Sequence, residues 1–132
     1  MISGKQKIEM EKILIVDDDI NLCTVLKEEL AAIGYETEFL TGGEEVADFV
    51  KNNHTDLILL DLKMPGKNGF DVLQDLENFK HNSHPKVIVL TAYADVKSAI
   101  ASAKMGASDF ISKPYDFDEL LITIRKVLQR EN

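Results

Sequence analysis

The sequence predicts an α/β fold in which one parallel sheet of five strands is covered by helices on both faces. Five short apolar runs recur along the 132 residues, and segments whose apolar residues follow helical spacing lie between them. Strands and helices that alternate five times require a mostly parallel sheet with right-handed crossovers. The length suits a single domain that buries a core of its own.

The predicted strands are of two kinds. The first, third and fourth runs are continuous and rich in Val, Ile and Leu, as strands buried on both faces must be. The second run places Glu36 and Glu38 between less polar residues, an alternation that is typical of a half-exposed edge strand. The five predicted strands cover residues 13–16, 35–40, 57–60, 87–90 and 109–112.

A helix is expected after each strand. The first helix should present an apolar stripe to the core, made of Leu22, Val25, Leu26, Leu30 and Ile33. Gly34 follows in the position where many helices end, and Asp19, Asp95 and Asp116 stand where helix N-caps are needed. Glu29 falls inside the stripe, and the helical spacing gives no reason for it. The other four helices are predicted near residues 46–50, 70–80, 96–107 and 117–128.

Charge and composition exclude several classes of protein. Lys and Arg total 15 against 23 Asp and Glu, and the basic residues are scattered, so direct nucleic-acid binding by this segment is not expected. No apolar run is long enough to cross a membrane. Residues 1–10 are interpreted as a leader that precedes a domain of residues 11–132. Cys23 is the only cysteine, which fits a cytoplasmic location. Solvent-facing positions without acidic partners are predicted for His54, His81 and His84.

Polar residues follow the strands at one edge of the predicted sheet. Asp17 and Asp18 come directly after the first strand, and Asp61 follows the third. Thr91 follows the fourth, and Lys113 follows the fifth. The carboxyl ends of parallel strands share an edge, where the ligands of open α/β sheets bind. We therefore expect these residues, which are spread over most of the chain, to meet in one pocket.

The residue types in this pocket indicate a metal and a phosphoryl group. Three carboxylates in one pocket repel one another, and a divalent cation relieves that repulsion. Oxygen ligands without His or Cys at ligand spacing favour Mg²⁺, or Mn²⁺, over zinc. A metal held by carboxylates beside a lysine and a hydroxyl suits phosphoryl transfer, and an aspartate can then act as the nucleophile.

Four segments resemble response-regulator receiver domains of two-component signalling. They are ILIVDDD at residues 13–19, LDLKMPG at 60–66, VLTA at 89–92 and FISKP at 110–114. The resemblance extends over about residues 11–130, and its motifs agree in order and spacing. It implies the flavodoxin-like, doubly wound fold with strand order 2-1-3-4-5.

The resemblance also implies roles at the metal site. Asp61 matches the phosphoacceptor, Asp18 the direct metal ligand and Asp17 its water-mediated neighbour. The backbone carbonyl of Lys63 is expected to complete the metal contacts. Asp19 could be a further ligand, but we interpret it as the cap of the first helix.

Further roles implied by the resemblance concern the phosphoryl group and the response to it. Thr91 matches the hydroxyl that bonds a phosphoryl oxygen, and Lys113 matches the cation that pairs with that oxygen, with a cis peptide before Pro114. Phe110 matches the aromatic switch position. Receivers commonly dimerise or bind effectors through the fourth helix, fifth strand and fifth helix. Ile122 of the predicted fifth helix is expected to face solvent in the isolated domain. In a dimer or effector complex it is expected to be buried at the contact.

The implied phosphoryl donor is a sensor histidine kinase or a phosphotransfer protein. A homodimer that depends on phosphorylation is also expected. Lys63 and Tyr93, each two residues beyond a site residue, should stand at the rim of the phosphoryl site. The domain is interpreted as a phosphoacceptor that assists its own phosphorylation and dephosphorylation, and not as an enzyme.

Other functions fit these residues less well. A phosphohydrolase of the haloacid-dehalogenase kind needs a second Asp two residues after its nucleophile, where this sequence has Lys63. A flavin-binding electron carrier needs a phosphate cradle after the first strand, where three aspartates would repel the phosphate. A receiver that works by binding alone is disfavoured because every key polar position is present.

The output of the domain is interpreted from a second resemblance. Residues 91–97, 105–107 and 113–118 are similar to receivers of nitrogen-regulation-type transcriptional activators, which favours a piece cut from a longer regulator. A stand-alone receiver that acts through protein–protein binding is the alternative.

Overall fold

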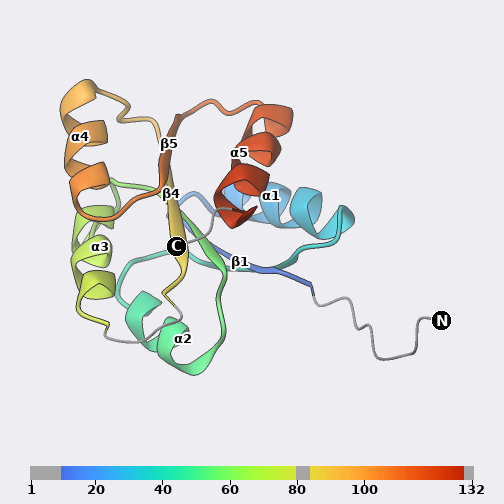
Figure 1. Cartoon of the computed structure of the whole chain (residues 1–132), viewed down its shortest axis with the longest axis horizontal. Coiled ribbons are helices and arrows are strands. Elements are labelled where there is room, and N and C mark those ends of the chain that lie inside the picture. Colours follow the sequence, from blue (N-terminus) through green and yellow to red (C-terminus); the bar gives the residue numbers. More distant parts are fainter. Residues whose placement is uncertain (1–9, 80–83, 130–132) are drawn as a thin grey trace.

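The computed structural model of the protein describes residues 10–79 and 84–129, and in these ranges strands and helices alternate five times (Figure 1). The strands are β1 (Lys12–Val16), β2 (Glu36–Leu40), β3 (Leu57–Leu60), β4 (Lys86–Thr91) and β5 (Asp109–Ser112). The helices are α1 (Ile20–Ala32), α2 (Val46–Asn52), α3 (Gly69–Glu77), α4 (Val96–Lys104) and α5 (Phe117–Gln129). Each predicted strand is therefore present, with its ends shifted by no more than one residue.

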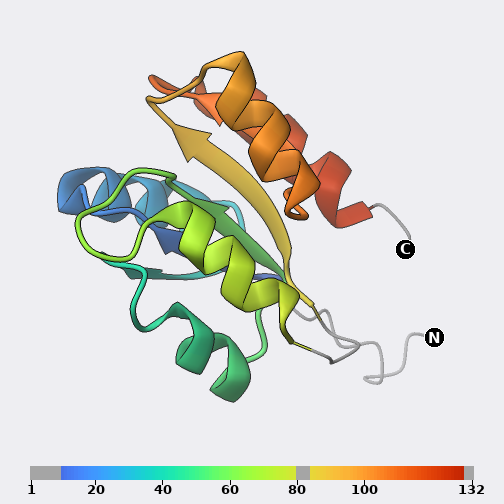
Figure 2. The same ribbon diagram turned by 90° about the vertical axis from the view of Figure 1, so that its left-hand side faces the viewer.

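All four strand pairings are parallel, and the order across the sheet is β2-β1-β3-β4-β5. This confirms the predicted doubly wound topology. The helices α1 and α5 cover one face of the sheet, whereas α2, α3 and α4 lie on the other face (Figures 1 and 2). The strand β2 lies at an edge, as the alternation of Glu36 and Glu38 predicts, and both glutamates are exposed.

Alternate residues of the central strands fill two separate cores. Ile13 and Ile15 of β1 pack with α1 and α5, while Leu14 and Val16 of the same strand pack with α2 and α3. All four side chains are at most 2% exposed, which explains the continuous apolar runs of the sequence. The sheet is therefore packed on both faces, and its carboxyl edge supports the residues that follow the strands.

The predicted apolar stripe of α1 is wrong at two positions. Val25 is 51% exposed and Ile33 is 42% exposed, whereas Cys23 is completely buried with Leu26 and Leu30. A helix turns by about 100° per residue, so residues 23, 26 and 30 share one narrow face and Val25 lies off it. Cys23 therefore belongs to the core, and its thiol donates to the Asp17 carbonyl oxygen at 3.3 Å.

The helix ends follow the predicted signals. The Asp19 carboxylate accepts from the backbone of Asn21 and Leu22, and Asp95 and Asp116 cap α4 and α5 in the same way. The helix α1 ends before Gly34, which has a φ of 107°. Two predicted helices extended too far: α3 ends at Glu77, and α4 ends at Lys104 because the chain leaves helical geometry near Gly106.

None of the helices within residues 10–79 and 84–129 has the length and apolar character needed to cross a membrane. The predicted leader, residues 1–10, lies outside the described residues except for Met10, which is exposed. The leader therefore stays a prediction, and His81 also lies outside the described residues.

Candidate functional site

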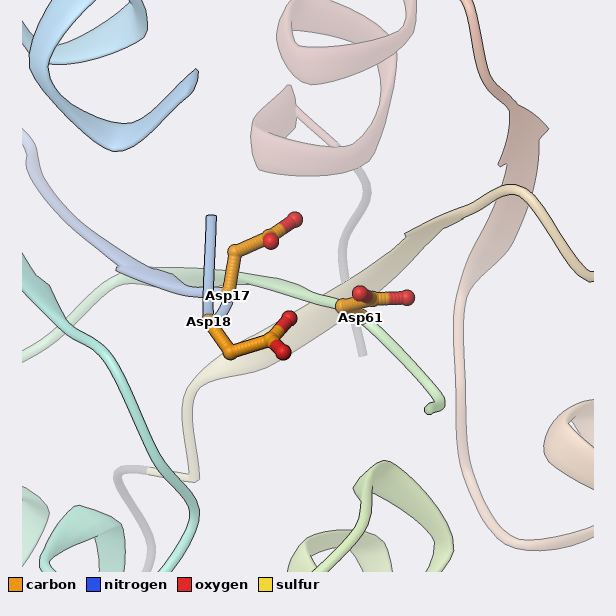
Figure 3. A group of neighbouring side chains, drawn as sticks. All are labelled: Asp17, Asp18 and Asp61. Carbon is orange, nitrogen blue, oxygen red and sulfur yellow. The ribbon is translucent and has the colours of Figure 1, made fainter. Parts of the chain in front are cut away.

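Three carboxylates meet at the carboxyl edge of the sheet, as expected (Figure 3). Asp17 follows β1 and Asp61 follows β3, and these neighbouring strands hold the two residues side by side. Asp17, Asp18 and Asp61 each offer an oxygen that lies within 4.8 Å of the others. Asp17 and Asp61 are only 2% and 6% exposed, whereas Asp18 is open to solvent. Two of the three charges are therefore poorly hydrated.

Lys113 brings a positive charge to this cluster from the end of β5. Its ammonium donates to Asp17 Oδ2 at 2.6 Å and to Asp61 Oδ2 at 3.5 Å. Burial raises the pKa of Asp17, even though the hydrogen bond from Lys113 opposes this shift. Burial acts to lower the pKa of Lys113, but the hydrogen bond to Asp17 and the two negative charges outweigh it and raise the pKa. Lys113 is therefore a firmly protonated cation between two carboxylates.

The backbone holds the two buried aspartates in place. The Asp17 N–H donates to Leu40 O at 3.1 Å, and its carboxylate accepts from the Asp19 N–H at 2.9 Å. The backbone N–H of Asp61 donates to Val16 O at 2.9 Å. A Cβ atom on Gly69 would lie only 2.4 Å from the Asp61 carbonyl oxygen, so the start of α3 can press against Asp61 only because residue 69 is glycine.

A cavity of about 520 Å³ opens over the carboxylates. Its walls include Asp17, Asp18, Asp61, Lys63, Tyr93 and Lys113. The ammonium of Lys63 lies 4.6 Å from the centre of the Tyr93 ring, so the two side chains form a cation–π pair at the rim. Both residues thus stand where their spacing from Asp61 and Thr91 predicts.

Thr91 lies at the end of β4 and is completely buried, and it is not among the residues that line the cavity. Its hydroxyl accepts from the Tyr93 N–H at 3.2 Å, and its carbonyl accepts from the Lys113 N–H at 2.9 Å. The backbone of Thr91 is thereby joined to that of Lys113. The Lys113–Pro114 peptide is cis, as predicted.

Two predicted residues lie apart from the cavity. Phe110 of β5 is half-buried and in register with Val89, on the sheet face that α3 and α4 cover. Ile122 is 57% exposed on α5, whereas Leu120 and Ile124 of the same helix are buried. The predicted exposure of Ile122 is confirmed, and its role in a contact stays a prediction.

Sequence reasoning missed three contacts in which acidic side chains take part. Glu29 accepts from the Tyr115 hydroxyl at 3.0 Å, which explains a glutamate in the apolar stripe of α1. Glu44 accepts from a backbone N–H of the loop that follows Asp61. His54 was predicted to lack an acidic partner, and this is wrong, since its Nε2 lies 2.8 Å from Asp56 Oδ1. The first two contacts join residues that are distant in sequence, so no local pattern signals them.

Comparison with known proteins identifies the family. The family model described as the response regulator receiver domain matches residues 13–125. The chain belongs to this family. The receiver is 33% identical over 123 residues to the regulatory protein AtoC of Escherichia coli K12, a match that covers 93% of this chain and 26% of AtoC.

Solved structures of other receivers agree with this assignment. A CheY-like receiver domain protein of Methanospirillum hungatei JF-1 is 32% identical, with a TM-score of 0.82 over 91% of this chain and 94% of that one. The response regulator TrrA of Thermotoga maritima, solved in complex with Mg²⁺ and BeF, is 36% identical. Its TM-score is 0.78 over 89% of this chain and 99% of TrrA.

The receiver spans only part of the curated relatives that it matches. It covers 26% of AtoC, 27% of the transcriptional regulatory protein ZraR of Klebsiella oxytoca, and 50% of the ycf27 regulator of Porphyridium aerugineum. Membership of this family makes the protein a receiver domain of two-component response regulators.

Proposed function

We propose that this receiver takes a phosphoryl group onto Asp61 in a Mg²⁺-dependent reaction. The observation that carries the proposal is the position of the Asp61 carboxylate. It is buried beside the oxygens of Asp17 and Asp18, and its Oδ2 lies 3.5 Å from the Lys113 ammonium. A nucleophilic carboxylate, a cluster of oxygen ligands and a cation thus share one cavity, which is the arrangement that phosphoryl transfer needs.

The donor set fits a hard divalent cation. All three clustered side chains offer carboxylate oxygens, and two of these carboxylates are buried with a single ammonium to balance them. Asp17, Asp18 and Asp61, together with the Lys63 carbonyl, would hold Mg²⁺, or Mn²⁺ in its place. When bound, such an ion neutralises charge on the phosphoryl oxygens.

The residues of the chain would then carry the transfer. An oxygen of Asp61 bonds to phosphorus while the bond from phosphorus to the donor breaks, and an aspartyl phosphate results. Lys113 would pair with one phosphoryl oxygen, and the Thr91 hydroxyl, which now accepts from the Tyr93 N–H, would donate to another. The domain thus assists its own phosphorylation and dephosphorylation without acting as an enzyme on other molecules.

The phosphoryl group would act on the face formed by α4, β5 and α5. Thr91 is the last residue of β4 and its hydroxyl bonds to Tyr93, which lines the cavity, while Phe110 lies on the adjacent strand β5. Ile122 is an exposed apolar residue on α5 that suits a contact with a second copy or an effector. The relatives AtoC and ZraR are regulatory proteins of greater length, which favours a piece of a longer transcriptional regulator over a stand-alone receiver. A cytoplasmic location stays a prediction.

Intact-mass analysis after incubation with Mg²⁺ and acetyl phosphate tests the phosphoacceptor. The wild-type protein should gain the mass of one phosphoryl group, and a chelator should abolish the gain. Asp61→Asn should gain nothing. Asp118→Asn is the matched control, because Asp118 is an exposed residue of α5 that does not line the cavity, and it should be phosphorylated like wild type. Undiminished phosphorylation of Asp61→Asn would exclude Asp61 as the acceptor.

A further inference from the structure

A carboxylate outside the metal cluster bonds to the loop that follows the phosphoacceptor. Glu44 lies in the connection between β2 and α2, and its Oε2 accepts from the Lys67 N–H at 3.1 Å. Lys67 lies in the connection between β3 and α3, the segment that begins with Asp61 and includes Lys63. This N–H holds the pKa of the Glu44 carboxyl below its usual value, so Glu44 bonds as the carboxylate.

The two connections fit closely, and glycines make the fit possible. Gly66 has a φ of 74°, and a Cβ at this position would lie 2.6 Å from Glu44 Oε2. A Cβ on Gly43 would lie 2.7 Å from the Lys67 carbonyl oxygen. A side chain at Gly43 would therefore push the connections apart, whereas a side chain at Gly66 would displace the Glu44 carboxylate. The Glu44 carboxylate consequently rests directly on the turn at Gly66 and Lys67.

The connection after β3 is anchored at two further points. The Gly69 N–H donates to Leu62 O at 2.9 Å, close to Asp61. The Lys67 ammonium pairs with Asp75 of α3. These contacts fix the beginning and the far end of the connection to α3. Among the described residues, the bond to Glu44 is the one hydrogen bond that ties the turn at Gly66 and Lys67 to the connection between β2 and α2. A cavity whose lining includes Asp18, Glu44 and Pro65 lies beside this bond.

We propose that Glu44 is a positioning residue for the cation site. By bonding to Lys67, it holds the connection after β3 in the course that places Lys63 in the wall of the cavity over the three aspartates. The inference rests on the proposed Mg²⁺ function. Glu44 is not itself a ligand in this proposal, and its effect depends on the reach of its side chain more than on its charge.

Three variants separate reach from charge. Glu44→Asp keeps the charge and shortens the side chain by one methylene, so the bond to Lys67 is lost. Glu44→Gln keeps the reach and an acceptor oxygen but removes the charge. Glu45→Gln removes a charge from the neighbouring exposed residue, which makes no side-chain cap bond and lines the same cavity. The readouts are the Mg²⁺ dissociation constant, from titration followed by backbone amide NMR signals, and the hydrogen-exchange rate of the Lys67 amide without metal.

We expect Glu44→Asp to weaken Mg²⁺ binding by about threefold or more and to speed exchange of the Lys67 amide. Glu44→Gln should bind Mg²⁺ as Glu45→Gln does, with slow Lys67 exchange. The inference is overturned if Glu44→Asp leaves either readout unchanged, or if Glu44→Gln weakens binding more than Glu44→Asp does. Wild-type protein that binds no Mg²⁺ would instead refute the proposed function itself, and the role of Glu44 with it.

Discussion

The ammonium of Lys113 lies 2.6 Å from an oxygen of Asp17, although 96 positions separate the two residues. Each is the other's closest charged partner among the contacts described, and Asp17 is almost completely buried. In the metal-free protein Lys113 therefore neutralises a carboxylate that a divalent cation would also use. Lysine and metal ion should compete for it.

We expect Lys113→Met to bind Mg²⁺ on the order of tenfold more tightly, even though it should be phosphorylated more slowly. Removal of a positive charge next to a cation site reduces repulsion, and such charges interact by several kcal/mol in a partly buried site. Lys126→Met, which removes the same charge from an exposed position on α5, should bind like wild type. Calorimetric titration with MgCl₂ measures both, and weaker binding by Lys113→Met would contradict the competition.

The rim pair of Lys63 and Tyr93 should prolong the life of the aspartyl phosphate. The two side chains touch across the cavity mouth, where the ring obstructs an attacking water and the ammonium can hold a phosphoryl oxygen. The double variant Lys63→Ala/Tyr93→Ala should lose its phosphoryl group several-fold faster, as measured by release of phosphate after the donor is removed. An unaltered or slower rate would rule out shielding by this pair.

Phosphorylation should change the positions of Thr91 and Phe110 together. The Thr91 hydroxyl now accepts from the Tyr93 N–H, and a phosphoryl oxygen on Asp61 would draw it away as a donor. This motion empties space beside β4, into which the Phe110 ring can turn, since it has no hydroxyl that needs a partner. Structures with and without Mg²⁺ and beryllofluoride should show two Phe110 rotamers. The same rotamer in both states would disprove the coupling.

Ile122 should be buried in a contact that forms only in the activated state. Its side chain is exposed. On α4, which belongs to the same proposed α4–β5–α5 surface, the side chains of Val96 and Ile100 are 75% and 52% exposed. Sedimentation with beryllofluoride should detect self-association or partner binding that Ile122→Glu abolishes. Val25→Glu is the matched control because Val25 is similarly exposed but lies on α1, outside the surface formed by α4, β5 and α5. If activation changes nothing, or if Ile122→Glu behaves like wild type, this surface is no interface.

The hydrogen bond from Tyr115 to Glu29 should make stability fall at alkaline pH. Burial, together with the neighbouring carboxylate, raises the pKa of Tyr115 to about 12 from 10.0. Because the folded state holds the proton more tightly than the unfolded state, this stabilisation is complete below pH 10.0 and is lost as the pH rises towards about 12.

Tyr115→Phe should cost about 1 kcal/mol of unfolding free energy at neutral pH, and the difference from wild type should vanish in strong alkali. Urea unfolding at a series of pH values measures this difference. Glu29→Gln keeps an acceptor for the phenol and should lose less than Tyr115→Phe. A difference that is independent of pH would show that the phenol proton is not linked to folding.

Much of this architecture could be predicted because it depends on local patterns. The continuous run of β3 and the carboxylates that follow β1 and β3 are visible in the sequence, and parallel strands leave little choice about where they meet. The stripe of α1 was misjudged because Val25 and Ile33 are as apolar as the residues that are buried. Which side of a helix faces the sheet depends on the angle at which the helix packs.

The contacts of Glu29 and Glu44 could not be predicted, for a different reason. The bond from Tyr115 to Glu29 spans 86 positions, and the bond from Lys67 to Glu44 spans 23 positions between two irregular connections. No periodicity relates such residues. The contacts depend on how loops settle once the sheet has formed, and that is a property of the tertiary structure.

The burial of Cys23 makes this protein well suited to site-specific labelling. Cys23 is the only cysteine, and its burial raises the pKa of the thiol to about 12, so at neutral pH it carries almost no reactive thiolate in the folded protein. A probe thiol introduced at a solvent-facing position, such as Val96→Cys, would be the one site that maleimide reagents modify. Fluorescent or spin-label reporters could then follow motion of α4 without any need to remove the native cysteine from the core.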